Sequence, residues 1–139
     1  MRSKYIADDV KCRMLDRLIF RHADIDRRVV TGKNVNFVPN SLEVVIHPYT
    51  TIGNNVKIYQ QVTIGRGDIW KNESSDFIGF SIEDDVVVCA GAKIICSYGK
   101  LTVRKGSIIG ANSVLTQSTG EYEIWAGIPA RKIGIRNEK

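Results

Sequence analysis

Aliphatic residues recur at every sixth position through most of the chain, beginning with the stretch IHPYTTIGNNVKIYQQVTIG. The repeats stop at residues 66–80, resume, and continue to about residue 119. A period of six matches neither the period of about 3.6 of an amphipathic helix nor the period of about 2 of a half-buried strand. The first position of each repeat is aliphatic: Ile46, Ile52, Ile58, Ile64, Ile82, Val88, Ile94, Val103, Ile109 and Leu115.

The other positions of the repeat fit a chain that turns a corner in every hexad. The second to fourth positions hold Gly, Asn, Asp and other turn formers, which tolerate positive φ and bond their own backbone. Three hexads would complete one coil of ~18 residues, with the aliphatic positions of successive coils stacked. The fifth position is small or β-branched: Thr50, Val56, Val62, Val86, Ala92, Ser107 and Ser113. The pattern predicts a mainly β protein, a parallel β-helix over residues 31–119.

Three stretches overshoot the six-residue period, at residues 37–45, 66–80 and 97–102. Insertions in a solenoid project as loops on one face, which is often the binding face. We therefore predict a projecting loop at 66–80. Its Trp70, Phe77 and Phe80 would either stack on a sugar or cover the wall of the prism.

The two ends of the chain leave the repeat. Six apolar residues form a helical stripe, Ile6, Val10, Met14, Leu15, Leu18 and Ile19. This stripe predicts an N-terminal helical cap within residues 1–30 that covers the open edge of the first coil. Residues 120–139 predict an extended closing segment. At 139 residues the chain has the length of a single domain.

Composition narrows the class of protein. Hydrophobic residues make up 43% and charged residues 25%, and no apolar run approaches the ~20 residues of a membrane span. The first residues, MRSKYIADDVKC, show no export signal, so we expect a cytoplasmic protein. Three cysteines without a CxxC pair disfavour a disulfide framework and a zinc knuckle. The net charge of +5 is compatible with nucleic-acid binding, but no aromatic-interleaved motif supports it. Binding of a phosphate-bearing small molecule fits this charge at least as well.

Four segments, NNVKIYQQVTIG, AGAKI, IIGANSVL and WAGIPARKIG, together resemble the hexapeptide-repeat acyltransferases. The similarity covers residues 31–135 and is closest to the serine acetyltransferase branch and to its relatives that O-acetylate sugars. It implies a left-handed parallel β-helix, a homotrimer, and sites in the clefts between subunits. It also implies acetyl-CoA as the donor and a small-molecule hydroxyl as the acceptor, with no metal.

The resemblance assigns the donor slot to small corner residues. Stacked glycine-rich corners expose backbone N–H groups and let a pantetheine arm approach closely, although the same residues also serve tight turns. The candidates are Gly65, Ala90, Gly91, Gly110 and Ala111. For the cofactor's phosphates we expect Arg131 and Lys132, with Lys93, Arg104 and Lys105 as second candidates; a solvated basic tail is the alternative.

Acetyl transfer to a hydroxyl also needs a base, and both histidines of the resembled family are missing here. The first position reads Pro39 or Asn40 and the second reads Gly79. The chain's own two histidines are His22, which we expect at the surface near the end of the cap, and His47. His47 holds a corner position, as the base or as a turn residue. Other proton acceptors near the two lost positions are Glu43, Glu73 and Asp76.

The sequence thus predicts an acetyl-CoA-dependent O-acetyltransferase that acts on a hydroxyl of a sugar or another small metabolite. The alternative is a catalytically silent trimeric β-helix that binds a metabolite or a partner protein, because both family histidines are absent. A β-helical carbonic anhydrase is disfavoured, since its metal needs three histidines and the chain has two.

Overall fold

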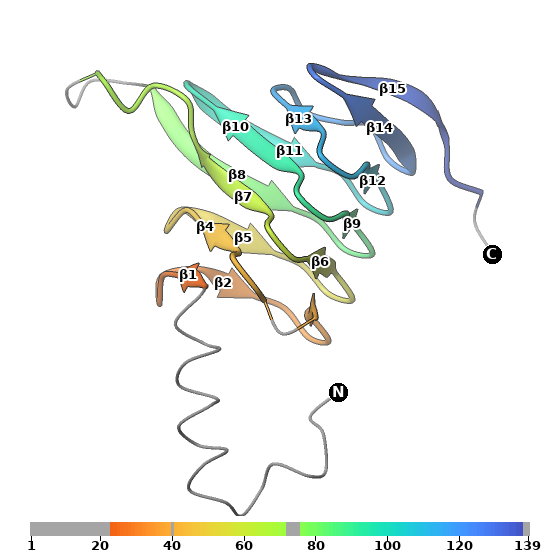
Figure 1. Ribbon diagram of the computed structural model, residues 1–139, viewed down its shortest axis with the longest axis horizontal. Helices are drawn as coiled ribbons and strands as arrows, with labels where there is room; N and C mark the ends of the chain where they lie inside the picture. The colour runs from red at the N-terminus through yellow and green to blue at the C-terminus, as the bar shows by residue number, and fades with distance from the viewer. Residues whose placement is uncertain (1–22, 40, 72–75, 138–139) are drawn as a thin grey trace, which may run out of the picture.

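The computed structural model describes residues 23–39, 41–71 and 76–137. These residues form a parallel β-helix whose coils stack from β1 to β14 (Figure 1). Sheet A contains β1 (Asp24–Ile25), β4 (Val45–Ile46), β7 (Thr63–Arg66), β10 (Lys93–Cys96) and β13 (Val114–Leu115). Sheet B contains β2 (Val30–Thr31), β5 (Thr50–Ile52), β8 (Phe77–Ile82) and β11 (Gly99–Val103). Sheet C contains β3 (Asn36–Val38), β6 (Lys57–Tyr59), β9 (Val87–Val88), β12 (Ile108–Ile109), β14 (Glu123–Gly127) and β15 (Ala130–Ile135).

The hexads set the register of the sheets. In sheet A, Ile64 lies opposite Ile46 on one side and opposite Ile94 on the other, and Ile94 lies opposite Leu115. All ten predicted first positions and all seven predicted fifth positions are buried. Burying these aliphatic side chains stabilises the fold by about 25 cal/mol for each Å² of apolar surface that is removed from water. The predicted mainly β, parallel β-helix is confirmed.

Three corners join the sheets in each coil. Among the described residues, the A–B corner comprises 26–29, 47–49, 67–71 with 76, and 97–98. The B–C corner comprises 32–35, 53–56, 83–86 and 104–107, and the C–A corner comprises 39, 41–44, 60–62, 89–92 and 110–113. At the B–C and C–A corners the fourth residue of the hexad has positive φ: Asn34, Asn55, Gln61, Asp85, Gly91, Gly106 and Asn112. The turn formers of the repeat are therefore required by the backbone of the corner.

The solenoid begins before residue 31. Strands β1 and β2 pair with β4 and β5, with Ile25 opposite Ile46 and Thr31 opposite Ile52. Residues 23–30, which were predicted as part of a helical cap, are therefore strands and a turn. The helical stripe of residues 6–19 lies outside the described residues.

The projecting loop is shorter than predicted. It leaves the prism at the A–B corner, between β7 and β8 (Figure 1), and ends at Asp76 because β8 starts at Phe77. Phe80 lies opposite Thr50 in sheet B and is 1% exposed, so it belongs to the core. The overshoot at residues 97–102 is likewise mostly strand β11.

The last strands close the stack with an antiparallel hairpin. Strand β14 extends sheet C by parallel pairing with β12, and β15 turns back along β14. Trp125 and Ala130 are buried against the last coil. No helix within the described ranges is long and apolar enough to cross a membrane.

Candidate active site at the corner between sheets A and B

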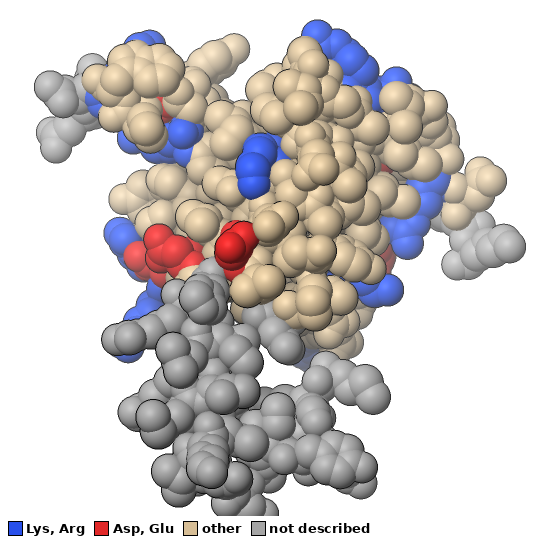
Figure 2. Space-filling model, viewed as in Figure 1, with Lys and Arg blue, Asp and Glu red and all other residues tan. Residues whose placement is uncertain are grey.

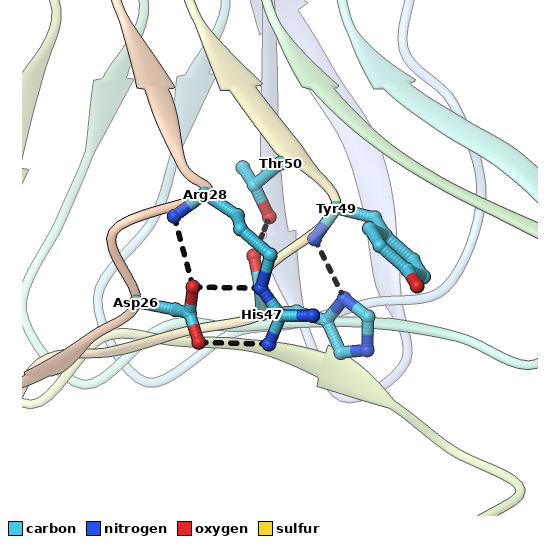
Figure 3. Close-up of polar contacts among 5 residues, drawn as sticks. All are labelled: Asp26, Arg28, His47, Tyr49 and Thr50. Atoms are coloured by element: carbon cyan, nitrogen blue, oxygen red, sulfur yellow. Dashed lines mark hydrogen bonds and ion pairs between the residues drawn. The ribbon is translucent and has the colours of Figure 1, made fainter.

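The A–B corners of the first three coils stack at the base of the projecting loop. The first two corners bring Asp26 and Arg28 next to His47 and Tyr49. Phe77, the first residue of β8, packs on the ring of His47. Figure 3 shows the first two of these corners, with the imidazole of His47 beside the backbone of Tyr49. The sequence singled out His47, and the structure surrounds it with groups from three coils.

One nitrogen of His47 belongs to the turn. Its Nδ1 accepts a hydrogen bond from the N–H of Tyr49 at 3.1 Å, and its carbonyl accepts one from Oγ1 of the buried Thr50 at 2.6 Å. Asp26 does the same one coil earlier, since its Oδ1 accepts from the N–H of Arg28 at 2.8 Å. Both side chains cap their corner by bonding the N–H two residues on, a turn that short polar side chains favour.

Aromatic rings surround the imidazole. The His47 ring meets those of Tyr49 and Phe77 edge to face, with centroids 5.4 Å and 5.0 Å away, and Phe80 lies 6.0 Å away. These contacts, together with the turn bond, fix the plane of the ring. The ring is partly buried.

Two guanidinium groups flank the imidazole, and each forms a pair of hydrogen bonds with one carboxylate. Nε and Nη2 of Arg28 bond the two oxygens of Asp26 at 2.9 Å, and Arg66 bonds Asp68 in the same way. Arg28 lowers the pKa of Asp26 well below its usual range, and Arg66 lowers that of Asp68. Burial first, and then the positive charges of Arg66 and Arg28, lower the pKa of His47. The imidazole is therefore neutral at pH 7.

A shallow hollow of about 280 Å³ lies on sheet B beside this corner. It combines exposed apolar side chains with two cations and several hydroxyl groups, and its lining includes Arg28, Val30, Tyr49, Thr51, Ile78 and Lys100. Tyr49 and Arg28 also contact His47 or its corner, so the hollow and the imidazole are neighbours. A small polar molecule with an apolar face fits such a lining.

The predicted donor residues gather at a different corner. The N–H of Asn112 bonds the carbonyl of Ala90, which stacks the corner of Gly110 and Ala111 on the corner of Ala90 and Gly91. Gly65 does not join them. It lies on β7 opposite Ile95, toward the end of the strand that leads to the A–B corner.

Local packing also explains the two glycines of this corner. Gly91 has positive φ, and a side chain there would collide with the amide oxygen of Asn112. A Cβ at Gly110 would lie 3.0 Å from the Cβ of Ala126. The tight turns therefore account for these two glycines. Ala111 is exposed, and its small side chain leaves space on the outer side of the corner.

The basic residues that were predicted to bind the cofactor's phosphates differ in the contacts that they make within the chain. Arg131 lies opposite Ala126 at the C–A edge, is exposed, and donates to the carbonyl of Ala130 at 3.2 Å. Lys132 forms an ion pair with Glu123 at 2.9 Å. Among the second candidates, Nζ of Lys93 donates to the carbonyl of Gln61 at 2.6 Å. Arg104 and Lys105 lie at the B–C corner, away from the stacked glycines. On the face drawn in Figure 2, Lys and Arg side chains form separate groups.

Comparisons with known proteins point to one enzyme. No family model matches the chain. A serine acetyltransferase of Staphylococcus epidermidis is 37% identical over 122 residues, which are 86% of this chain and 54% of that protein. One from Staphylococcus aureus strain N315 is 37% identical over 108 residues, covering 76% and 47%. The solved structure of a truncated serine acetyltransferase apoenzyme matches with a TM-score of 0.69 at 34% identity, covering 80% of this chain and 43% of that one.

The chain resembles the serine acetyltransferases in sequence and in fold. A serine acetyltransferase solved in complex with CoA also matches, with a TM-score of 0.69 at 30% identity over 88% of this chain and 48% of that one. The resemblance read from the hexads is confirmed. The chain spans about half the length of the curated relatives that it matches.

The serine acetyltransferase resemblance placed a histidine at position 79, and the structure shows why the chain has glycine there. Gly79 is buried with a φ of 152°, and a Cβ would collide with the carbonyl oxygen of Tyr49. That carbonyl accepts the N–H of Phe80 at 2.9 Å. The corner of His47 and Tyr49 therefore occupies the space that a side chain at position 79 would need.

The other position of that resemblance falls on Pro39 or Asn40, and Asn40 lies outside the described residues, as do His22 and Glu73. Its neighbours Ser41 and Glu43 belong to the C–A corner, and Oε2 of Glu43 accepts from Nε2 of Gln61 at 3.0 Å. Asp76 is exposed where the projecting loop ends. Ser41 and Glu43 thus lie at the C–A corner, whereas Gly79 lies in β8 of sheet B.

Sequence reasoning missed Asp26, Arg28 and Tyr49 as partners of His47. Residues 23–30 were assigned to the helical cap, which hid Asp26 and Arg28. A signal was present, because IDRR and IHPY both begin with an aliphatic first position and lead into the same corner of successive coils.

Proposed function

We propose that the chain is an acetyl-CoA-dependent O-acetyltransferase that acetylates a hydroxyl of a sugar or another small metabolite. One observation carries this proposal. The stacked corner of Ala90, Gly91, Gly110 and Ala111 lies beside the exposed Arg131, in a chain that resembles an enzyme solved with CoA. Small residues leave room for the pantetheine arm of CoA, and a guanidinium suits the phosphates of CoA.

The donor would lie along the C–A corner. Arg131 is the better phosphate ligand, because Lys132 is already paired with Glu123. The exposed Ala111 would face the pantetheine arm. We assign Gly65 no part in this slot, since it lies at the opposite edge of sheet A.

The acceptor would lie in the hollow on sheet B. Lys100 and Arg28 offer cationic donors there, Thr51 offers a hydroxyl, and Tyr49 and Ile78 offer apolar surface. This mixture suits a sugar or an amino acid, whose polar groups need donors while their carbon skeletons pack on apolar groups.

A homotrimer would complete the site. Within one chain, the C–A corner and the A–B corner lie at opposite edges of sheet A, so the proposed donor and acceptor residues are apart. If neighbouring subunits abut along these edges, the C–A corner of one faces the A–B corner of the next. Each cleft between subunits then holds one complete site.

The reaction also needs a group that removes the proton of the hydroxyl. The hydroxyl oxygen forms a bond to the thioester carbon, the carbon–sulfur bond breaks, and the proton passes through the base to the leaving thiolate. At the described part of the C–A corner, Glu43 is the carboxylate. Cys89 shares this corner, but burial raises the pKa of its thiol and keeps it protonated. We assign the base to Glu43.

A thiol-release assay tests the proposed function. The chain is incubated with acetyl-CoA and a panel of sugars and amino acids, and free CoA is measured. We expect thiol release that depends on an acceptor, and a decrease in kcat of about 100-fold in Glu43→Gln. If CoA binds but no acceptor is acetylated, the proposal is wrong and the catalytically silent alternative takes its place.

A further inference from the structure

We propose that His47 is a fixed hydrogen-bond donor, whose Nε2–H holds an oxygen of the acceptor, and that it is not the base that deprotonates the hydroxyl. The identity of the ligand rests on the proposed function. The protonation state of the ring does not, and it is argued from the geometry of the corner.

The turn decides which nitrogen carries the proton. Nδ1 of His47 accepts the N–H of Tyr49 at 3.1 Å, and a backbone N–H can only donate. A proton on Nδ1 would set two N–H groups against each other. A neutral ring therefore carries its proton on Nε2, because the bond made by one nitrogen sets the state of the other.

The ring holds Nε2 away from the turn. In Figure 3 the second nitrogen of His47 points away from the backbone of Tyr49. The edge-to-face contacts with Tyr49 and Phe77 restrict rotation of the ring. No described residue forms a hydrogen bond with Nε2, so this donor is available to a bound molecule.

The surrounding charges favour the neutral ring. The ionisable groups that face it are Arg28 with its partner Asp26, Arg66 with its partner Asp68, and the phenol of Tyr49. Burial and the two guanidiniums lower the pKa of His47, and Asp26 opposes them only in part. An N–H donor between two cations suits an oxygen that carries partial or full negative charge.

The bound molecule would lie in the neighbouring hollow. Arg28 and Tyr49 line the hollow and also flank His47. His47 itself lies beside the lining of the hollow, and we place a carboxylate or carbonyl oxygen of the acceptor at this border, where Arg28 and the Nε2–H would both donate to it. The hydroxyl to be acetylated would then extend toward the neighbouring donor corner.

The first coil suggests a variant that separates the turn from the donor. Asp26 caps its corner with a short side-chain oxygen, and an asparagine at position 47 can cap its corner in the same way. His47→Asn thus keeps the acceptor for the N–H of Tyr49 and removes the Nε2–H. His47→Ala removes both and serves as the matched comparison.

Long-range ¹H–¹⁵N NMR of the imidazoles tests the protonation state without any substrate. The chain has two histidines, so His22→Gln leaves the signals of His47 alone. We expect a neutral ring with its proton on Nε2 at pH 7. A proton on Nδ1, or an imidazolium at pH 7, would overturn the proposal. Because this measurement needs no transfer reaction, it tests the protonation state even if the chain proves not to acetylate anything.

Kinetics test the contact with the acceptor. We expect His47→Asn to raise KM for the acceptor roughly tenfold, with unchanged Tm and affinity for CoA. The low-pH limb of kcat should stay where it is, because protonating the ring leaves the Nε2–H in place. We expect His47→Ala to lower Tm as well. An unchanged KM in His47→Asn, or a low-pH limb that disappears with the histidine, would contradict the donor role.

Discussion

His47 uses its two nitrogens for different purposes. Nδ1 caps a turn of the β-helix, as Asp26 does one coil earlier, while Nε2 points away from that turn. The repeat alone shows a histidine at a corner, and it leaves the choice between a turn residue and a working group open. The structure answers that both descriptions apply, each to one nitrogen.

The electrostatics of this corner predict the effect of removing Arg28. In Arg28→Gln the pKa of His47 should rise, because a nearby positive charge is lost and Asp26, which favours the imidazolium, is left unpaired. The measurement is an NMR titration of the His47 ring in a His22→Gln background.

Lys100→Gln is the control for this titration. Lys100 lines the same hollow, but it does not contribute to the shift of the His47 pKa. The pKa should therefore stay where it is in that variant. Equal shifts in the two variants, or a lower pKa in Arg28→Gln, would show that the guanidinium does not act on the ring as described.

At the level of strands, the sequence predicts the interior of the β-helix well and its ends poorly. All the aliphatic first positions from Ile46 to Leu115 are buried, because the period of six directly encodes which side chains point inward. Residues 23–30 were missed because Thr31, which holds the first position of the next hexad, is polar and exposed and so masks the period. Phe80 was missed because it fills a fifth position, where small residues are the rule.

The closing hairpin depends on one carboxylate. Oε2 of Glu123 accepts the N–H of Gly120 at 2.6 Å and the indole N–H of Trp125 at 2.9 Å, and Oε1 pairs with Lys132. These donors, Lys132 foremost, lower the pKa of Glu123 to about 2. The hairpin covers the last coil, so its attachment protects that end of the core.

We therefore predict an acid-dependent loss of stability through Glu123. Its folded-state pKa is depressed, so its contribution is complete above the ordinary pKa of about 4.5 and is lost as the pH falls toward about 2. Glu123→Gln should lower the free energy of unfolding by about 1–3 kcal/mol at pH 7. Urea unfolding at several pH values measures this.

The pH dependence supplies the check on that assignment. The difference in stability between the native chain and Glu123→Gln should shrink between pH 4.5 and pH 2, where Glu123 itself becomes protonated. Glu121, an exposed neighbour, is the matched control, and Glu121→Gln should change little. A difference that is constant over this pH range would rule out the carboxylate as the cause.

Across the whole molecule, the proposed site is divided between two edges of one sheet. The small residues and Arg131 lie at the C–A edge, and His47 with the hollow lies at the A–B edge. The sequence named the small residues and Arg131 of the first group and His47 of the second, but it missed Arg28 and Tyr49, and its candidate Gly65 lies apart from the other donor candidates. It did not predict their separation, because a one-dimensional repeat does not say which hexads share a corner once insertions shift the count.

The central claim is that the C–A corner binds the CoA donor. Isothermal titration of acetyl-CoA tests it in the native chain and in Ala111→Trp, which would fill the proposed slot from an exposed position. Thr116→Trp is the control, since Thr116 is also exposed but lies beyond β13, outside that corner. We predict binding to the native chain and to Thr116→Trp, and affinity weakened at least roughly tenfold in Ala111→Trp. No binding to the native chain, or equal affinity in the two tryptophan variants, would contradict the account.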